Sequence, residues 1–386
     1  MLRVLALSTL FPDVSRPRFG PFVERQTQGL AAHPDVDLRV VAPIGLPPGP
    51  FARMGSYAPL SRLPERENWN GLDTYRPRFV HFPGTAGRFD AAMLAGALLP
   101  KLRRLREEFA FDIIDAQFFF PDGPAAVTLG KALGVPVSIK ARGSDIHFWG
   151  QRLATRKQIM SAGMAADGLL AVSAALKADM VAMGMRGDRI IVHHTGVDLD
   201  LFRPVDRESS RSALGINGPL IVSAGTLGKR KGQGLLIEAL ADLPDAVLVL
   251  IGSGPERAAY ENRALALGLA DRVRFTGSIG HEELAGWMGA ADVMALPSAS
   301  EGLANVWVEA LACGTPLVIT DVGGAREVIA SPLAGHLVPA DAGAIADAIR
   351  DLVDHPRDPL AVRKIAERFT WDANSSALYA HLASLI

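Results

Sequence analysis

The sequence predicts an α/β protein built from two doubly wound domains in tandem, each a parallel sheet covered by helices. Short β-branched and aliphatic runs alternate with helical patterns up to about residue 200, and the same rhythm restarts after residue 204. Such alternation is typical of parallel strands joined by crossover helices. The length of 386 residues is also about twice that of a usual domain, which favours two domains.

The individual elements follow in order from these patterns. In the first half we expect strands at "RVLALS", "DLRVVAP", "DIIDAQ" and "VPVSIKA", and helices at "FVERQTQGLAAH" and "GPAAVTLGKALG". In the second half we expect strands at "PLIVSAGTL", "AVLVLIGSG", "RVRFTG", "ADVMALP" and "PLVITD", with helices at "GQGLLIEALADL" and near residues 255–268.

The stretch "HHTGVDLDLFRPVDRE", residues 193–208, separates the two sets of elements and is the predicted linker. We therefore predict an N-terminal domain at 1–200 and a C-terminal domain at 201–369. Residues 370–386 are predicted to form a helix that packs back on the first domain. A ligand is expected in a cleft between the two sheets, because open α/β sheets bind ligands at the carboxyl ends of their strands.

Two segments of the first half depart from this rhythm. The segment from Pro43 to Pro64 is rich in Pro and Gly, so we expect a long loop rather than a regular helix or central strand. In "LLPKLRRLREEF", Leu98, Leu102, Leu105 and Phe109 share one helical face. An ordinary solvated helix on a sheet is the favoured interpretation, and a helix on a membrane surface is the alternative.

Composition excludes several classes of protein. The net charge is −1, with 24 Lys and Arg against 19 Asp and Glu in residues 1–200 and 16 against 22 in residues 201–386. A nucleic-acid binder should be strongly basic. The single cysteine, Cys313, lies in an apolar stretch and is expected to be buried. No run of eighteen uncharged apolar residues and no signal peptide is found, so we expect a cytoplasmic protein.

The stretch "ASEGLANVWVEALACGTPLVI", residues 299–319, carries the strongest chemical signal. It reads as a loop followed by a helix that ends at Gly314. Glu301 is then expected just before the helix and Glu309 about two turns inside it. The first backbone N–H groups of the helix, around Leu303 to Val306, have no partner within the helix and offer a site for a phosphate.

A basic loop is expected at the same edge of the sheet. The stretch "GTLGKRKGQG" lies between a strand and a helix and carries Lys229, Arg230 and Lys231. Cations that face a helix N-terminus suit a diphosphate, whose charge must be stabilised as it departs. Carboxylates accept hydrogen bonds strongly, so Glu309 is placed for a ribose diol and Glu301 for the hydroxyls of a sugar.

With these motifs, the chain resembles the retaining glycosyltransferases of family 4, which have the GT-B fold and an E-x7-E motif. Glu301 and Glu309 stand at that spacing. The resemblance covers nearly the whole chain and includes "VSAALKADMVAMGM", "IIVHHTGVDLDLFRP", "LVLIGSGPE", "VRFTGSI", "HEELAGWMGAADV" and "GGAREVI".

The resemblance implies that the domain at 1–200 binds the acceptor and that the domain at 201–369 binds the nucleotide sugar. It also implies a role for each motif residue. Glu301 and Lys231 would act on the donor sugar and the leaving phosphates, and Glu309 would hold the ribose. The other donor-binding residues would be Asn305, Leu303, Gly302, Arg230, Thr226 and Gly225. The loop "RFGPF" with Gly20 and the stretch "ARGSDIH" with Asp145 would form acceptor or cleft loops.

Two positions depart from the common family pattern. Arg142 replaces a frequent histidine before Gly-Ser-Asp, and Thr226 replaces a frequent arginine. Arg142 is included among the expected catalytic residues because it can bring positive charge or bond a sugar, although it cannot act as a base. Thr226 brings no charge, which Lys229 or Arg230 would supply.

Other motifs weigh less. In "IGSGPER", Gly252 and Gly254 are followed by Arg257 where a dinucleotide fingerprint requires glycine. Asp198 and Asp200 form a short Asp-x-Asp pattern in the linker, which favours a structural role. His193 and His194 are adjacent on an apparent strand end and would point to opposite faces, a poor geometry for binding one metal.

The expected function is transfer of a hexose from a UDP- or GDP-sugar to a hydroxyl of a saccharide or lipid-linked acceptor, with retention and without a metal or other cofactor. The alternatives are a nucleotide-sugar epimerase, a phosphorylase, or a scaffold that binds the nucleotide sugar without turnover. The seven cations of residues 76–106 against one acid further suggest peripheral docking on an anionic membrane surface.

Overall fold

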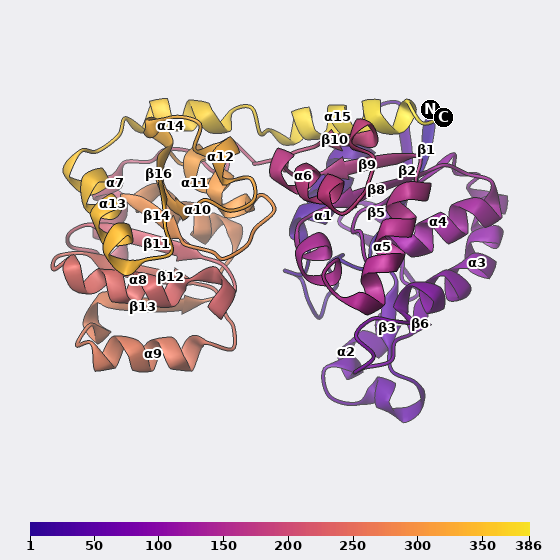
Figure 1. Cartoon of the computed structure of the whole chain (residues 1–386), viewed down its shortest axis with the longest axis horizontal. Helices are drawn as coiled ribbons and strands as arrows, with labels where there is room; N and C mark the ends of the chain where they lie inside the picture. The colour runs from indigo at the N-terminus through magenta and orange to yellow at the C-terminus, as the bar shows by residue number, and fades with distance from the viewer. The chain divides into compact units, whose positions relative to one another are not determined.

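The alternation of strands and helices gives two separate sheets in the computed structural model, which describes residues 1–386 (Figure 1). The N-terminal unit comprises Met1–Gly196 together with Trp371–Ile386, and the C-terminal unit is Val197–Thr370. The chain therefore passes between the units twice, after residues 196 and 370, close to the boundaries at 200 and 369 that the sequence suggests.

The N-terminal unit is built on an eight-stranded sheet in the order β10-β9-β8-β7-β1-β2-β5-β4. All neighbours are parallel except β4, which pairs antiparallel with β5. The strands are β1 (Leu2–Leu7), β2 (Val36–Val41), β4 (Arg66–Trp69), β5 (Leu72–Tyr75), β7 (Ile113–Ala116), β8 (Val137–Ala141), β9 (Gly168–Ala171) and β10 (Ile190–Val192).

Helices cover this sheet because its strands are apolar on both faces. Helix α1 packs against α15, and α4 packs against both α3 and α5. The helices are α1 (Pro21–Ala31), α3 (Asp90–Glu108), α4 (Asp122–Leu133), α5 (Leu153–Ala165), α6 (Ala174–Ala182) and α15 (Trp371–Ala383), with single turns at Asp145–Trp149 and Gly187–Arg189.

The burial of side chains on α3 distinguishes between the two interpretations of the amphipathic pattern at residues 98–109. Leu98, Leu102 and Leu105 on this helix are buried, as is Phe109 directly after it. The apolar face of α3 is therefore covered by the unit itself, and the interpretation as a solvated helix on a sheet is the correct one.

An excursion leaves the sheet after β2. The prediction of a plain loop from Pro43 to Pro64 was wrong in part, because this segment contains β3 (Ile44–Leu46), a 3-10 turn at Gly49–Arg53 and α2 (Tyr57–Ser61). Strand β3 pairs in parallel with β6 (Arg78–Val80) in a separate two-stranded sheet. Elements this short lie below the window in which hydrophobic periodicity is visible. Ile44, Leu60 and Leu63 give the excursion a small core of its own.

The C-terminal unit contains a six-stranded parallel sheet in the order β13-β12-β11-β14-β15-β16. Helix α8 contacts both α9 and α13. Helix α10 contacts α7 and α11, and α11 also contacts α14. The elements are β11 (Leu220–Ala224), β12 (Val247–Ile251), β13 (Val273–Gly277), β14 (Val293–Leu296), β15 (Leu317–Thr320), β16 (Gly335–Val338), α7 (Arg207–Leu214), α8 (Gln233–Ala239), α9 (Arg257–Ala266), α10 (His281–Ala290), α11 (Asn305–Ala312), α12 (Ala325–Val328), α13 (Ala342–Asp354) and α14 (Pro359–Ala366).

Three minor features have plain structural explanations. Asp198 accepts hydrogen bonds from the backbone N–H groups of Asp200 and Leu201, so the Asp-x-Asp pattern builds a turn. Cys313 is buried, and burial raises the pKa of its thiol to about 12. None of the helices combines the length and the apolar character that crossing a bilayer requires.

Candidate active site

The topology of the C-terminal unit selects one edge of its sheet. Strand order reverses between β11 and β14, which are hydrogen-bonded neighbours, so the loops after these strands diverge to opposite faces. Ligands of open α/β sheets bind at the carboxyl ends of the strands at such a switch point. The basic loop of residues 225–232 and the acidic loop of residues 297–304 both begin there.

The centre of this edge is an ion pair between the two loops. The Nζ atom of Lys231 lies 2.5 Å from Oε1 of Glu301, and both side chains are largely, though not fully, shielded from solvent. Because a lysine ammonium has three hydrogens, this bond leaves two for a ligand. Sequence patterns assigned the two residues to different parts of a donor, and the structure brings them together.

The N-terminus of α11 lies directly after Glu301. The N-cap residue, Ala304, makes no side-chain cap, and its carbonyl accepts the Trp307 N–H at 3.1 Å. The N–H groups at the start of the first turn, which begins at Asn305, are therefore placed to bind an anion. Leu303 and Gly302 are buried residues of the acidic loop. Glu309 is buried at 8% exposure and lies little more than one turn into α11. The prediction of two turns was wrong because the helix begins at Asn305.

Glycines allow the loops of this edge to pack closely. Gly252, after β12, has a φ of 137°, and a Cβ atom there would collide with the carbonyl oxygen of Gly225. Gly254 approaches the backbone of Leu227 in the same way. The glycines of "IGSGPER" therefore support the basic loop, which accounts for them without a dinucleotide.

The loop after β15 supports Glu301 from behind, a contact that the motif analysis missed. The Gly324 N–H donates to the carbonyl oxygen of Gly302 at 2.7 Å, and Thr320 Oγ1 donates to the carbonyl oxygen of Ser298 at 2.5 Å. The "GG" of "GGAREVI" was the available signal, although the sequence does not reveal which loop it contacts.

The remaining predicted donor residues line the outer part of the edge. Arg230 and Thr226 are exposed, and the Arg230 carbonyl accepts from the Ala299 N–H at 2.8 Å. The Thr226 carbonyl accepts from Gln233 Nε2 at 3.2 Å. Both side chains are therefore exposed to solvent, while the Arg230 backbone joins the two loops and the Thr226 backbone is bonded to the start of α8.

In the N-terminal unit, Arg142 follows β8 and is held mainly by Gln117. Its Nε donates to the Gln117 carbonyl and its Nη2 to Gln117 Oε1, each at 2.6 Å, while the guanidinium lies 5.0 Å from the ring centre of Phe22. Burial lowers the pKa of Arg142 to about 10, so it stays charged at neutral pH. Nη1 has no partner among the protein groups and is the atom left for a ligand.

Asp145 has a different role from a ligand contact. Its carboxylate is fully buried and accepts the backbone N–H groups of Phe119, Arg142, Gly143 and Ile146 at 2.8–3.1 Å. A carboxylate that is satisfied in this way fixes the loop after β8 and cannot reach an acceptor.

A buried lysine beneath Arg142 was not predicted. Lys140 Nζ donates to Gln26 Oε1 at 2.6 Å and to His193 Nδ1 at 2.7 Å. The other ring nitrogen of His193 lies 2.8 Å from the Asn374 carbonyl, so it carries the proton and Nδ1 accepts. Burial lowers the pKa of both Lys140 and His193 well below their usual values. A lysine inside the apolar strand "VPVSIKA" was the signal available in the sequence.

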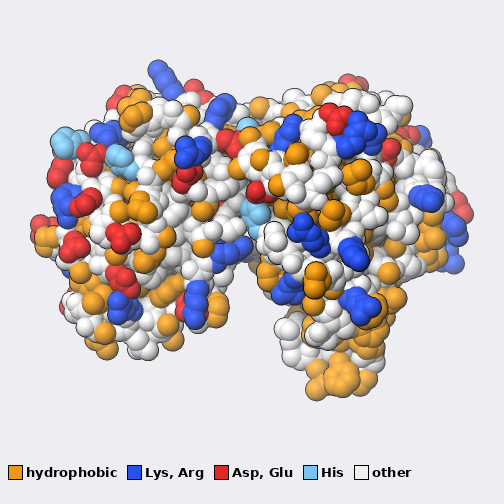
Figure 2. Space-filling view, in the orientation of Figure 1, with side chains coloured by type: hydrophobic (Ala, Val, Ile, Leu, Met, Phe, Trp, Pro, Cys, Tyr) orange, Lys and Arg blue, Asp and Glu red, His pale blue; other side chains and the backbone are white.

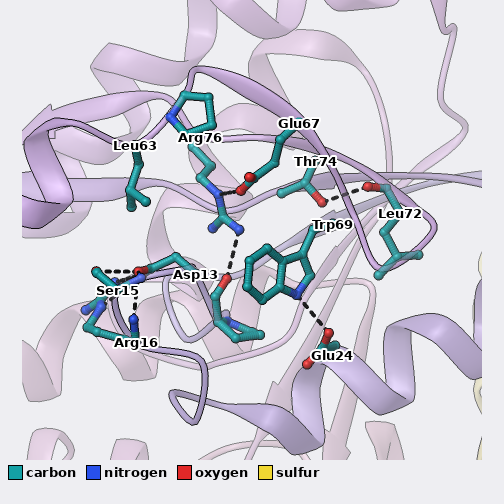
Figure 3. A network of polar contacts seen from close by, with 12 residues as sticks. Asp13, Ser15, Arg16, Glu24, Leu63, Glu67, Trp69, Leu72, Thr74 and Arg76 are labelled. Atoms are coloured by element: carbon teal, nitrogen blue, oxygen red, sulfur yellow. Dashed lines mark hydrogen bonds and ion pairs between the residues drawn. The ribbon is translucent and has the colours of Figure 1, made fainter.

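The loop with Gly20 is braced by the β4–β5 hairpin (Figure 3). Arg76 is buried, forms an ion pair with Glu67 and donates from Nη2 to the Pro12 carbonyl at 2.8 Å. Trp69 Nε1 donates to Glu24 of α1 at 2.7 Å. Within the loop, Asp13 accepts from Ser15 and Arg16, as the dashed lines in Figure 3 show.

Gly20 itself is the N-cap of α1 and has a φ of 71°, which glycine adopts without strain. A Cβ atom there would lie 2.5 Å from the Leu10 carbonyl oxygen, so only glycine lets the loop fold onto the end of β1. The loop is thereby fixed at both ends, by Arg76 at Pro12 and by the close approach at Gly20.

No group of three or more His, Cys, Asp or Glu side chains in the structure is arranged to hold a metal ion. The positive charge at the candidate site comes from Lys231 and the α11 N-terminus, whereas Lys229 is exposed to solvent.

Two sequence families match the chain. "Glycosyltransferase Family 4" matches residues 23–201, and "Glycosyl transferases group 1" matches residues 206–369. D-inositol 3-phosphate glycosyltransferase 1 of Catenulispora acidiphila is 35% identical over 336 residues, which cover 79% of this chain and 77% of that protein. The chain is a GT-B glycosyltransferase of the family 4 group.

The glycosyltransferase is also similar to TuaC of Bacillus subtilis, assigned to teichuronic acid biosynthesis, at 28% identity over 359 residues, or 90% of this chain and 88% of TuaC. HepE of Anabaena, solved in complex with UDP and glucose, matches with a TM-score of 0.75 over the full length of both chains at 22% identity. The predicted GT-B fold of two Rossmann-like domains is confirmed.

Proposed function

We propose that this glycosyltransferase moves a hexose from a UDP-sugar to a hydroxyl group of a saccharide or lipid-linked acceptor, with retention of configuration. The observation that carries the proposal is the Lys231–Glu301 ion pair beside the uncapped N-terminus of α11. A cation and free backbone N–H groups suit a diphosphate, and a carboxylate beside them suits the hydroxyls of the attached sugar.

The choice of UDP is supported by HepE, whose solved complex contains UDP and glucose. TuaC, assigned to teichuronic acid biosynthesis, supports a role in the synthesis of a surface polymer. Glu309 in α11 would accept hydrogen bonds from the ribose diol, while Asn305 and its neighbours would hold the diphosphate. Placement in the cytoplasm is part of the same proposal.

In the proposed reaction, the bond from the sugar C1 to the diphosphate oxygen breaks as a bond from C1 to the acceptor oxygen forms on the same face. The acceptor proton passes to an oxygen of the departing diphosphate, so no protein base is needed. Lys231 stabilises the charge that develops on the diphosphate in the transition state. An electrostatic contact that is stronger in the transition state than in the bound donor accelerates the reaction. Arg142 would contribute a hydrogen bond from Nη1 and could not accept the proton.

The test mixes the purified protein with UDP-, GDP- and ADP-hexoses and an acceptor, and follows the release of nucleoside diphosphate and the anomeric configuration of the product by NMR. Release of UDP with a retained linkage supports the proposal. Conversion of the donor without an acceptor would indicate an epimerase, a need for inorganic phosphate would indicate a phosphorylase, and binding without turnover would indicate a silent scaffold.

We also propose that the transfer needs no divalent metal, because Lys231 and the α11 N-terminus supply the charge that a metal would otherwise supply. Turnover should stay within about twofold in EDTA. The loss of one major contact to the transition state would already lower turnover about tenfold. Complete loss of transfer in EDTA, restored by Mg²⁺ or Mn²⁺, would contradict this part of the proposal.

A further inference from the structure

Exposed apolar side chains of the N-terminal unit gather on the excursion that carries α2 and on residues 80–93 beside it. Phe51 is 62% exposed and Met54 is 58% exposed, although large apolar side chains are usually buried. Figure 2 shows hydrophobic side chains covering the lower end of this unit, where Figure 1 places α2. We call this surface the apolar tip, and its exposed large side chains are Phe51, Met54, Val80, Phe82, Phe89 and Met93.

The apolar tip is a continuous surface. Phe51, Met54 and Phe82 line one hollow of about 570 Å³ together with Pro47 and Pro48. The same two prolines line a second hollow that reaches Val80 and Met93. The rings of Phe82 and Phe89 are 6.2 Å apart and meet edge to face. A contiguous exposed apolar surface of this kind marks a site of interaction.

The tip stands on a fixed base. Ile44, Leu60 and Leu63 are buried beneath it, so the exposed side chains are additional to the core of the excursion. Arg78 of β6 holds the segment after α2 to the start of β6, because it donates to the carbonyl oxygens of Leu63, Pro64 and Arg76. The tip is therefore presented to a partner by a folded element.

The exposed charge around the tip is positive, since Asp90 beside Phe89 is buried and pairs with His81. Residues 38–64 and 77–89 contain no Asp or Glu. Arg53, Arg62 and Arg88 in these segments are exposed, and Arg88 lies 5.6 Å from the ring centre of Phe89. Arginines beside exposed aromatic rings fit a surface that is apolar beneath and anionic at its boundary. A second copy of the tip would instead oppose arginine to arginine.

We propose that the apolar tip docks the enzyme on an anionic lipid bilayer, with Phe51 and Met54 inserted at the level of the head groups and Arg53, Arg62 and Arg88 against lipid phosphates. This assignment replaces α3 as the docking element. The apolar face of α3 is buried, and Arg106 donates to the Leu133 carbonyl inside the unit. Arg76 is buried as well, so this cation cannot meet a membrane.

The test measures co-sedimentation of the full chain with vesicles of phosphatidylcholine alone and of phosphatidylcholine with phosphatidylglycerol, without donor or acceptor. Failure of docking is therefore distinguishable from failure of the proposed transferase activity. We expect binding to the anionic vesicles only, reversed by salt, because each basic residue near an anionic surface contributes about a fivefold factor.

The double variant Phe51→Ser/Met54→Ser should bind the anionic vesicles at least about tenfold more weakly, since both side chains lose their burial in the interface. The variant Arg53→Ser/Arg88→Ser should weaken anionic binding and leave its unfolding temperature unchanged. The matched control is Leu265→Ser, because Leu265 on α9 is 69% exposed but lies in the other unit. It should bind like the wild type.

Three results would overturn the proposal. The first is equal or absent binding of the wild type to both kinds of vesicle. The second is loss of binding in Arg103→Ser/Arg104→Ser on α3 but not in the tip variants. The third is a dimer of the wild type in sedimentation that the tip variants abolish, which would assign the surface to contacts between copies.

Discussion

The two units use their polar residues in opposite ways. In the C-terminal unit, Lys231 and Glu301 pair at the rim of the sheet and remain partly open to solvent. In the N-terminal unit, Lys140, Arg76 and Asp145 are buried, and their partners are side chains or backbone groups of the same unit. Two sheets of similar design therefore carry polar groups for different purposes.

These different environments predict which property of the protein a substitution should change. A charge at an open edge costs little to the fold and can act on a ligand, whereas a buried charge is tolerated only because it is bonded. Changes at the C-terminal edge should alter turnover or affinity and leave the unfolding temperature nearly unchanged. Changes among the buried groups of the N-terminal unit should do the reverse.

The largest expected effect is that of Lys231→Ala, which should lower kcat by about 10²–10³-fold because the departing diphosphate loses a cation where charge develops. The KM for the donor should change less. Lys229→Ala is the control, since Lys229 is exposed in the same loop, and it should stay within about threefold. A rise in KM alone would mean that Lys231 only binds the donor.

The next effect tests the brace of the Gly20 loop. Arg76→Met should destabilise the N-terminal unit by about 2–3 kcal/mol, because the Pro12 carbonyl and Glu67 lose a buried partner. Differential scanning calorimetry should show a lower first transition, while UDP affinity stays unchanged. Arg66→Met, on the same hairpin but exposed, is the control and should shift the transition little. A fall in UDP affinity together with stability would contradict the assignment of a purely structural role to Arg76.

Glu309 combines two properties: it is a buried carboxylate of the C-terminal unit, and we propose that it contacts a ligand. Glu309→Ala should weaken UDP binding by about 1–3 kcal/mol through the loss of charge-assisted hydrogen bonds. Isothermal titration calorimetry measures this change, and Glu309→Gln should recover part of it by accepting one bond. Unchanged UDP affinity in the alanine variant would remove Glu309 from the ribose.

The smallest effect depends on pH and concerns Asp122, where burial and the nearby Asp145 raise the pKa to about 7. The folded state then holds a proton that the unfolded state releases near pH 4, so this contribution to stability is present below pH 4 and lost as the pH rises through about 7. Asn cannot lose a proton.

The unfolding temperature of Asp122→Asn should therefore rise relative to wild type between pH 5 and pH 8, by an amount equivalent to about 1–2 kcal/mol. Asp188→Asn is the control, because the Arg186 guanidinium lowers the pKa of the exposed Asp188. Its difference from wild type should be flat over this range. A flat curve for Asp122→Asn as well would mean that Asp122 is already ionised in the folded protein.

The sequence predicted β1, β2, β7 and β8 of the N-terminal sheet and β11 to β15 of the C-terminal sheet, because local hydrophobic patterns determine these strands. It missed β4, β5, β9, β10 and β16, which are only three or four residues long. It could not predict the excursion, whose elements are three to five residues long. It placed Lys231 and Glu301 at one edge through the rule for parallel sheets, although their direct contact spans 70 residues of sequence. The brace from Arg76 to Pro12 and the bond from Lys140 to His193 join residues with no shared local signal, so only the folded chain reveals them.

Helix α15 has a consequence for synthesis on the ribosome. Leu378 and Leu382 of this helix are buried in the N-terminal unit, and the Asn374 carbonyl accepts from His193. Because residues 371–383 are translated after the whole C-terminal unit, the N-terminal unit cannot complete its core until those residues have been synthesised. The C-terminal unit, which is continuous in sequence, can fold earlier. The order of folding would thus be the reverse of the order of translation. Until α15 is synthesised, the face of the N-terminal unit that this helix covers would stay exposed and accessible to chaperones.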